Sequence, residues 1–291
     1  MAEATTAMPV PHEPIPVRHA PMPVRHEQFR IRGLRIHAQI CGEGEPLLLY
    51  SGIFGEVRLW ERLLPHLPGF QTIAFDPPGI GRSQVPRYPQ TMWALADFGN
   101  AVLDELGLES ANVLGASFGG AVAQQMALSH PDRVDRLVLV STSHGAFAIP
   151  GDPMAFWHFI NPRSYHPERL ETVVGAMFGG RLRGEPELVC SMHIKRPQDM
   201  MAVMYRLAPL AGWTSLPWLH TIRHPTLVVA GDDDPVTPLV NHQVIAALIP
   251  AAQLHTVKGG GHMALLDSAS EVGPVITSFL QGDRGTSEDG G

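Results

Sequence analysis

Cysteine is scarce in this sequence, which holds two, Cys41 and Cys190, among 291 residues. They lie far apart and neither belongs to a CxxC pair, so the sequence predicts neither a disulfide framework nor a zinc ribbon. We expect both side chains to be reduced thiols in the core.

Basic charge and long apolar runs are also in short supply. The 21 Lys and Arg stand against 28 Asp and Glu, a formal net charge of -7, and no basic stripe is interleaved with aromatics. Such a chain repels phosphates, so we expect no nucleic-acid partner. No run of about 18 apolar residues is present that could cross a membrane, and residues 1–28 hold no apolar run of signal-peptide length. We therefore expect a cytoplasmic protein with no transmembrane segment.

Proline, by contrast, is concentrated near the N-terminus, where PIPVRHA and PMPVRHE form a near repeat. Frequent proline removes backbone donors and holds the chain extended, so residues 1–27 are predicted to be a mobile arm. Its three histidines could bind a metal, but a solvated low-complexity tail is the favoured interpretation. Residues 282–291 are polar and rich in glycine, which predicts a flexible tail.

Between these ends, short apolar runs alternate with helical patterns, and 44% of all residues are hydrophobic. Continuously apolar strands separated by helices are typical of a mostly parallel sheet flanked by helices, the α/β class. The strands are expected at 46–50, 71–75, 111–116, 136–141, 225–231 and 253–257. The helices are expected at 56–67, 91–107, 118–130, 238–250 and 264–281.

The alternation stops between residues 145 and 221, where no strand-like run occurs but large side chains are frequent. An insertion between two strands of one sheet is the simplest account. We expect a core of residues 28–144 and 222–281, and a helical lid of residues 145–221 over the carboxyl edge of the sheet.

A serine lies at a glycine-flanked junction of strand and helix, Gly115-Ala116-Ser117-Phe118-Gly119. Such a turn needs a strained backbone, and glycine two residues to either side lets helix and strand approach closely. The hydroxyl of Ser117 would then be exposed at the carboxyl edge as a nucleophile. The alternative is a glycine-rich turn that happens to carry a serine.

A serine nucleophile needs a histidine base and a carboxylate that orients the histidine. His262 follows the strand at 253–257, and Asp232, Asp233 and Asp234 follow the strand at 225–231. We choose Asp234, because it lies far enough beyond the strand to turn back over the edge and Pro235 stiffens the return. The other two aspartates are expected to bind loop backbone or to face solvent.

The tetrahedral oxyanion of such a reaction needs backbone N–H donors. We expect one from Phe118, where a new helix leaves its first amides unpaired. The second is expected from Ile53, although residues 51–55 could also be an ordinary flexible turn. No calcium-loop spacing, GxGxxG or P-loop lysine is present, so we expect neither a metal nor a cofactor.

From about Phe29 to Leu280 the chain resembles the α/β-hydrolase superfamily. Residues 76–83, DPPGIGRS, are similar to that superfamily's loop after the fourth strand. Many members place His-Gly before the oxyanion donor, whereas this chain has Ser51-Gly52. The departure leaves the backbone donor possible but puts in doubt any hydrogen bond from that side chain.

A narrower resemblance is to intracellular depolymerases of medium-chain poly(3-hydroxyalkanoates). It is carried by GWTSLPWLH at 212–220, HPTLVVAGDDDP at 224–235 and GGAVAQQ at 119–125. It implies a serine hydrolase that cuts the ester bonds of a storage polyester, with Ser117, Asp234 and His262 as its triad and a hydrophobic granule as its partner.

Methionine and aromatic residues of the insertion suit an apolar acyl pocket, although they could equally be the core of the lid. A Ser-His-Asp triad is also compatible with other functions, because proteins of one fold act on many different substrates. A small-molecule carboxylesterase or lipase, a carbon–carbon bond hydrolase and a non-catalytic scaffold remain alternatives. Chain-length preference, endo or exo cleavage and oligomeric state stay open.

Overall fold

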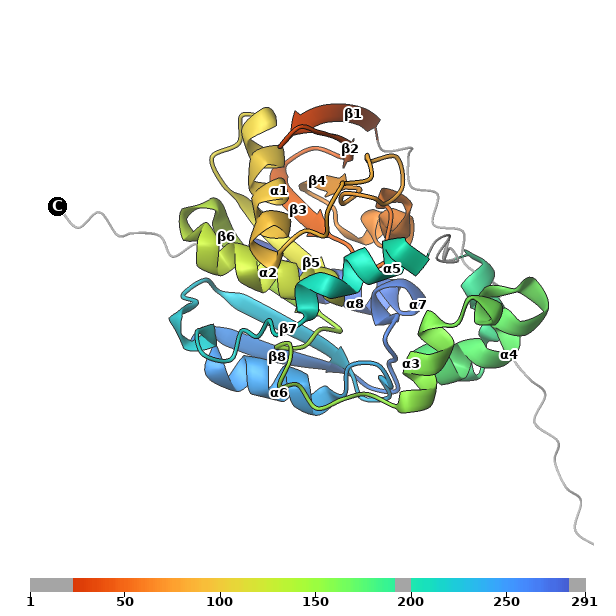
Figure 1. Cartoon of the computed structure of the whole chain (residues 1–291). Helices are drawn as coiled ribbons and strands as arrows, with labels where there is room; N and C mark the ends of the chain where they lie inside the picture. The colour runs from red at the N-terminus through yellow and green to blue at the C-terminus, as the bar shows by residue number, and fades with distance from the viewer. Residues whose placement is uncertain (1–22, 192–199, 283–291) are drawn as a thin grey trace, which may run out of the picture.

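The computed structural model describes residues 23–191 and 200–282, and within them eight strands form one sheet in the order β1-β2-β4-β3-β5-β6-β7-β8 (Figure 1). Strands β3 to β8 run parallel, whereas β1 and β2 are antiparallel to their neighbours. The mostly parallel sheet predicted from the apolar runs is confirmed. The strands are β1 Val24–Ile31, β2 Leu34–Cys41, β3 Glu45–Tyr50, β4 Phe70–Phe75, β5 Ala111–Ala116, β6 Val134–Val140, β7 Thr226–Gly231 and β8 Ala252–Val257.

Helices flank the sheet. The α-helices are α1 Met92–Glu105, α2 Phe118–Ser129, α3 Pro153–Ile160, α4 Pro167–Phe178, α5 Met200–Leu207, α6 Leu239–Leu248, α7 Ala264–Asp267 and α8 Ala269–Gln281. The 3-10 helices are η1 Val57–Arg62, η2 Leu64–His66, η3 Pro131–Arg133, η4 Pro162–Tyr165, η5 Gly180–Arg183, η6 Pro186–Ser191, η7 Ala208–Leu210 and η8 Leu219–Thr221.

Successive side chains of the central strands pack into two different hydrophobic clusters, one on each face of the sheet. Leu48 joins the cluster formed with α1, α2 and α6, whereas Leu47 and Leu49 join the cluster formed with η1, η2 and α8. All three leucines are fully buried, and burial of each stabilises the fold by about 2 kcal/mol. Because both faces are covered, these strands read as continuous apolar runs.

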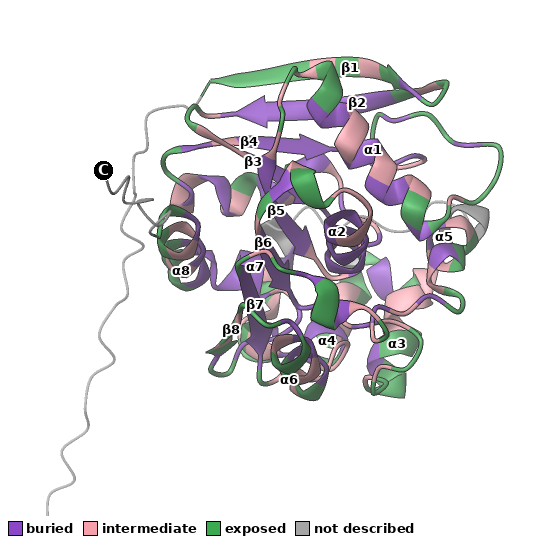
Figure 2. Ribbon diagram, turned by 90° about the vertical axis from the view of Figure 1, so that its left-hand side faces the viewer, coloured by how far each residue is buried: buried purple, intermediate pink, exposed green. Residues whose placement is uncertain are grey.

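The predicted boundary of the N-terminal arm at residue 27 is wrong, because β1 begins at Val24 and pairs with β2 along its whole length. This edge strand is mostly exposed (Figure 2) and carries polar and charged side chains, so no apolar run marks it. Main-chain pairing, from Val24 opposite Cys41 to Ile31 opposite Leu34, holds it in place. Residues 1–22 and 283–291 lie outside the described residues, as does the side chain of Cys190.

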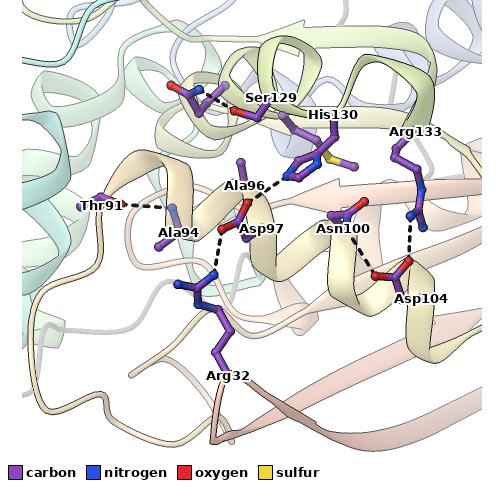
Figure 3. A network of polar contacts seen from close by, with 12 residues as sticks. Arg32, Thr91, Ala94, Ala96, Asp97, Asn100, Asp104, Ser129, His130 and Arg133 are labelled. Atoms are coloured by element: carbon purple, nitrogen blue, oxygen red, sulfur yellow. Dashed lines mark hydrogen bonds and ion pairs between the residues drawn. The ribbon is translucent and has the colours of Figure 1, made fainter.

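A polar network fastens the β1–β2 hairpin to the helices (Figure 3). Arg32, at the hairpin turn, donates to Asp97 of α1 at 2.8 Å, and Asp97 also contacts the His130 imidazole after α2 at 2.9 Å. Further along α1, Arg133 donates to Asp104 at 2.7 Å. Carboxylates of α1 therefore bind both the hairpin turn at Arg32 and the segment of residues 130–133.

Two predicted helices differ from those observed. Residues 57–66 form the 3-10 helices η1 and η2 rather than one α-helix, and Pro65 removes an amide donor at the start of η2. The helix expected at 264–281 is divided into α7 and α8 at Ser268, whose φ of -121° and ψ of 27° are not helical.

Between β6 and β7, the described residues form α3 to α5 and η4 to η8, and their one strand-like pairing is the bridge between Gly145 and Thr214. This insertion packs against the loop that follows β7. The Asp152 amide donates to the Pro235 carbonyl at 2.7 Å, and the Gly180 amide donates to the Asp233 carboxylate at 2.8 Å. The insertion therefore lies beside the carboxyl ends of the strands.

Candidate active site

Ser117 occupies the sharp turn between β5 and α2, with φ 53° and ψ -121°. The two flanking glycines are required by close packing. A Cβ on Gly115 would lie 2.4 Å from the Gly119 carbonyl oxygen, and one on Gly119 would lie 2.0 Å from the Tyr50 carbonyl oxygen. The Ser117 amide donates to the Val140 carbonyl at 2.8 Å, which fixes the turn to β6.

Three predicted site residues meet in one hydrogen-bonded chain. His262 Nε2 lies 3.0 Å from Ser117 Oγ, and His262 Nδ1 lies 2.9 Å from Asp234 Oδ2. The side chains of His262 and Asp234 are 4% and 0% exposed, respectively. The parallel sheet brings these residues together because each follows the carboxyl end of a strand. Serine hydroxyl, imidazole and carboxylate are therefore arranged as in a Ser-His-Asp triad.

Asp234 is held by its own loop. Its Oδ1 accepts from the amides of Val236 and Thr237 at 2.8 and 2.9 Å, and its Oδ2 accepts from the Thr237 hydroxyl at 2.7 Å. Burial alone would raise the pKa of Asp234, but His262 and the hydrogen bonds from Thr237 outweigh burial and lower it. The carboxylate facing the imidazole is therefore ionised at neutral pH.

The other two aspartates of the run point elsewhere. Asp233 accepts from Arg183 Nε at 2.6 Å and from the Gly180 amide at 2.8 Å, and the bond from Arg183 lowers its pKa. Asp232 accepts from the Gly259 amide at 2.6 Å. Both carboxylates bind loop or insertion groups, which leaves Asp234 as the one that contacts His262.

Phe178 and Thr142 support the site and carried no recognisable signal in the sequence. The His262 amide donates to the Phe178 carbonyl at 2.7 Å, and the two rings stack with centroids 6.4 Å apart. The Thr142 hydroxyl donates to the Ser117 carbonyl at 2.7 Å. Both residues act through tertiary contacts. Neither residue is therefore part of a sequence motif that could have identified it.

The turn of residues 51–55 lies against Ser117, since a Cβ on Gly52 would be 3.5 Å from the Ser117 Cβ. The Ser51 hydroxyl donates to the Gly55 carbonyl at 2.7 Å, so this serine closes its own turn. Within the described part of the chain, the amides of Ile53 and Phe118 donate no hydrogen bond. Both remain available to an oxyanion.

Comparison with known proteins adds to this geometry, because residues 45–269 match the alpha/beta hydrolase fold family. The chain belongs to that family. It is 41% identical over 242 residues to a poly(3-hydroxyalkanoate) depolymerase of Ectopseudomonas oleovorans, covering 82% of this chain and 85% of the relative. It is 31% identical to a 2-hydroxymuconate semialdehyde hydrolase of Pseudomonas sp. (strain CF600), covering 85% of this chain and 91% of the relative.

A solved structure of a hydrolase from Pseudomonas aeruginosa PA01 has a similar fold. Its TM-score is 0.72 at 28% identity, over 88% of this chain and 98% of that one. Fold and sequence therefore agree that this chain is an α/β hydrolase.

In this α/β hydrolase, a mostly apolar pocket opens beside Ser117 and His262. Its apolar lining consists of Ile53, Phe54, Leu59, Trp60, Ala116, Phe159, Tyr165, Phe178, Met263, Leu265 and Leu266. Phe159, Tyr165 and Phe178 come from the insertion, so its aromatics do reach the pocket.

The tryptophans of the insertion do not line this pocket. Trp213 is buried elsewhere and donates to Gln125 at 2.9 Å, and it packs edge-on against Trp218. Trp157 is 55% exposed. The side chains of Met200 and Met201 lie outside the described residues. Of the two alternatives left open by the sequence, the tryptophans do not follow the pocket-lining one, because Trp213 and Trp218 pack together and Trp157 faces outward.

Two further features of this hydrolase concern metals and membranes. Across residues 23–191 and 200–282, no three His, Cys, Asp or Glu side chains cluster closely enough to hold a metal ion. In the same part of the chain, no helix has the length and apolar character to span a membrane.

Proposed function

We propose that this chain is a serine hydrolase that cleaves the ester bonds of poly(3-hydroxyalkanoate), with a preference for medium-chain side groups. The observation that carries the proposal is the chain Asp234–His262–Ser117 opening onto an apolar pocket. The 41% identity to a protein named poly(3-hydroxyalkanoate) depolymerase supports it. Such a substrate is a storage granule inside the cell, so the proposed location is the cytoplasm at the granule surface.

In the proposed mechanism, Ser117 Oγ attacks the ester carbonyl while His262 Nε2 takes the hydroxyl proton. Asp234 accepts a hydrogen bond from the Nδ1–H of His262 and, as a carboxylate, stabilises the imidazolium. The amides of Ile53 and Phe118 bind the oxyanion of the tetrahedral intermediate. His262 then gives its proton to the departing alkoxide, which leaves an acyl-enzyme. Water, deprotonated by His262, attacks the acyl carbon; the bond to Ser117 Oγ then breaks, His262 returns the proton to Oγ, and the 3-hydroxy acid is released.

The chain-length preference follows from apolar burial. Each buried CH₂ contributes about 0.8 kcal/mol, so three extra methylenes favour a medium-chain unit by roughly 2 kcal/mol, or about thirtyfold in specificity. Glu56 and Arg58 also line the pocket, but Arg58 bridges to Glu61 at 3.3 Å and its side chain is 51% exposed. The walls next to Ser117 are apolar and suit an uncharged alkyl side group.

Carbon–carbon bond hydrolysis is the second candidate, because the chain is also 31% identical to a 2-hydroxymuconate semialdehyde hydrolase. The same three residues could serve that reaction, as they could serve a small-molecule carboxylesterase. A non-catalytic scaffold would need no activated serine. Labelling with a serine-reactive phosphonate distinguishes a scaffold from the depolymerase, the carbon–carbon bond hydrolase and the carboxylesterase. Only the three enzymes have an activated serine that would react.

The test of the function compares amorphous granules of a medium-chain polyester and of poly(3-hydroxybutyrate) at equal surface area, with released 3-hydroxy acids quantified. The expected result is about thirtyfold faster release from the medium-chain granules. Equal release would remove the chain-length preference. No release from either, with brisk cleavage of a dienoic carbon–carbon substrate, would favour the second candidate.

A pocket variant sharpens this test. Leu59 lines the pocket and is only partly buried, so Leu59→Trp should fill space with little strain. In this variant, the ratio of the release rate from medium-chain granules to that from poly(3-hydroxybutyrate) granules should fall at least fivefold, while the rate from poly(3-hydroxybutyrate) changes little. Leu254→Trp, at an exposed leucine of β8, is the matched control and should leave the ratio unchanged. An unchanged ratio in Leu59→Trp would contradict the assignment of this pocket to the acyl side group.

A further inference from the structure

Arg206, on helix α5 of the insertion, contacts both Ile53 and Phe118, the residues whose amides are proposed to bind the oxyanion. Its Nε donates a hydrogen bond of 2.7 Å to the Ile53 carbonyl oxygen. Its guanidinium carbon lies 5.7 Å from the centroid of the Phe118 ring. One side chain of the insertion therefore links the turn after β3 to the start of α2.

The surroundings of Arg206 are not those of a surface arginine. The residue is 5% exposed, and its Nη1 and Nη2 have no hydrogen-bond partner within residues 23–191 and 200–282. Burial lowers the pKa of Arg206 to about 9, against the opposing effect of the Asp76 carboxylate. A buried cation is costly, and an apolar side chain of similar length would avoid that cost. Packing alone therefore does not explain an arginine here.

The contact with Ile53 is directional. A guanidinium is planar, so its edge can donate to a carbonyl while its face lies over an aromatic ring. The hydrogen bond to the Ile53 carbonyl restrains rotation of that residue's backbone, and the cation–π contact restrains the Phe118 ring. Preorganised donors stabilise an oxyanion because they need no reorientation during the reaction.

We propose that Arg206 is a positioning residue that holds the Ile53 amide in its oxyanion-binding orientation. The inference rests on the proposed hydrolytic function of Ser117. Because α5 belongs to the insertion, the placement of the insertion then governs how well the oxyanion is bound. Arg206 acts through Ile53 and Phe118 and does not itself touch the reacting atoms.

Two variants separate the hydrogen bond from the charge. The Nε2 of glutamine lies four bonds from Cα, as does the Nε of arginine, so Arg206→Gln keeps a donor at the position that faces Ile53. Arg206→Met places a methyl group there and removes the donor. Tyr205→Phe is the matched control, because it removes the neighbouring bond from α5 to the Arg87 carbonyl, 3.3 Å long, without touching Ile53.

Each variant is assayed in two ways: turnover of a soluble medium-chain 3-hydroxyacyl ester, and inactivation by a phosphonate that labels Ser117. Arg206→Met should lower kcat and the maximal labelling rate about tenfold to a hundredfold, below the loss of a whole oxyanion donor. KM and the phosphonate concentration for half-maximal rate should stay within about threefold. Arg206→Gln should recover most of both rates, and Tyr205→Phe should match the wild type.

Wild-type rates in Arg206→Met, or a loss in Arg206→Gln as large as in Arg206→Met, would overturn the inference. So would a rise in KM alone, which would indicate a substrate contact or a general packing defect. If the wild-type protein labels with phosphonate but turns over no 3-hydroxy ester, the proposed substrate is wrong. The labelling rates of the variants then still decide the role of Arg206.

Discussion

The backbone amide of His262 donates a 2.7 Å hydrogen bond to the carbonyl oxygen of Phe178, the last residue of α4. The two rings lie nearly parallel, at an interplanar angle of 10°. The loop that carries the imidazole is thereby fastened to the insertion. The insertion thus helps to position the proposed base as well as to form the pocket wall.

Phe178→Leu should weaken this support. The side chain is 2% exposed, and its truncation should cost about 1 to 2 kcal/mol of unfolding free energy. Loss of the ring beside His262 should lower kcat about tenfold. Urea unfolding and steady-state kinetics measure the two effects. Phe156→Leu, at a 51% exposed phenylalanine of α3, is the control, and equal kinetics for the two variants would show that the Phe178 ring does not position His262.

Asp234→Asn and Asp233→Asn should differ sharply, although the residues are adjacent. The first places an amide beside His262 Nδ1 and favours the wrong imidazole tautomer, which should lower kcat by about 10⁴. The second removes a half-exposed pair with Arg183 and should change kcat less than threefold. Steady-state kinetics on one soluble ester is sufficient, and the reversed order of effects would show that Asp233 is the orienting acid.

Because of His242, we expect the stability of the folded protein to decrease in acid. This histidine is fully buried, and its Nε2 accepts from the Thr142 amide at 2.8 Å. Burial lowers the pKa of His242 from 6.5 to about 4, despite the nearby Asp234 carboxylate. Between these two values the unfolded state binds more protons than the folded state. Stability therefore rises with pH across this window and is lost as the pH falls from about 6.5 to about 4.

His242→Gln removes this titration while keeping an acceptor for the Thr142 amide. Between pH 7.5 and pH 4.5, the wild type should lose about 2 to 3 kcal/mol more unfolding free energy than the variant. Chemical denaturation at the two pH values measures the difference. Parallel losses in both proteins would indicate that His242 does not carry the acid sensitivity.

The central sheet was predictable because its strands are buried on both faces. Leu47, Leu48 and Leu49 are apolar without interruption, which marks β3 in the sequence. The hairpin of β1 and β2 was not predicted, because the edge strand exposes Arg25 and Gln28 and is held by main-chain pairing. Main-chain hydrogen bonding between strands does not depend on side-chain type, so amino-acid composition does not reveal it.

Deleting residues 1–27 should therefore lower the melting temperature, contrary to what the proline-rich composition suggests. The deletion removes half of β1, including His26, whose ring stacks on His37 with centroids 5.2 Å apart. Deletion of residues 1–22 leaves β1 whole and is the matched control, with little change expected. Thermal unfolding compares the two, and equal melting temperatures for both proteins would show that the first half of β1 adds no stability.

The three positions of the proposed triad were predictable because each follows a recognisable strand, and a parallel sheet brings such positions together at one edge. Phe178, Thr142 and Arg206 were not, since their contacts to His262, Ser117 and Ile53 span long separations in sequence without a motif. The sequence predicted that the pocket would be apolar, but it did not predict which residues line it. Its members depend on how the insertion packs.

Release of 3-hydroxy acids from amorphous medium-chain polyester granules, by the wild type and by Ser117→Ala, tests the central claim most directly. Removal of a triad nucleophile lowers turnover by about four to six orders of magnitude. We expect steady release by the wild type and a loss of that size in the variant, with the variant's fold shown by circular dichroism to be retained. Release by Ser117→Ala at more than a tenth of the wild-type rate would contradict the central claim.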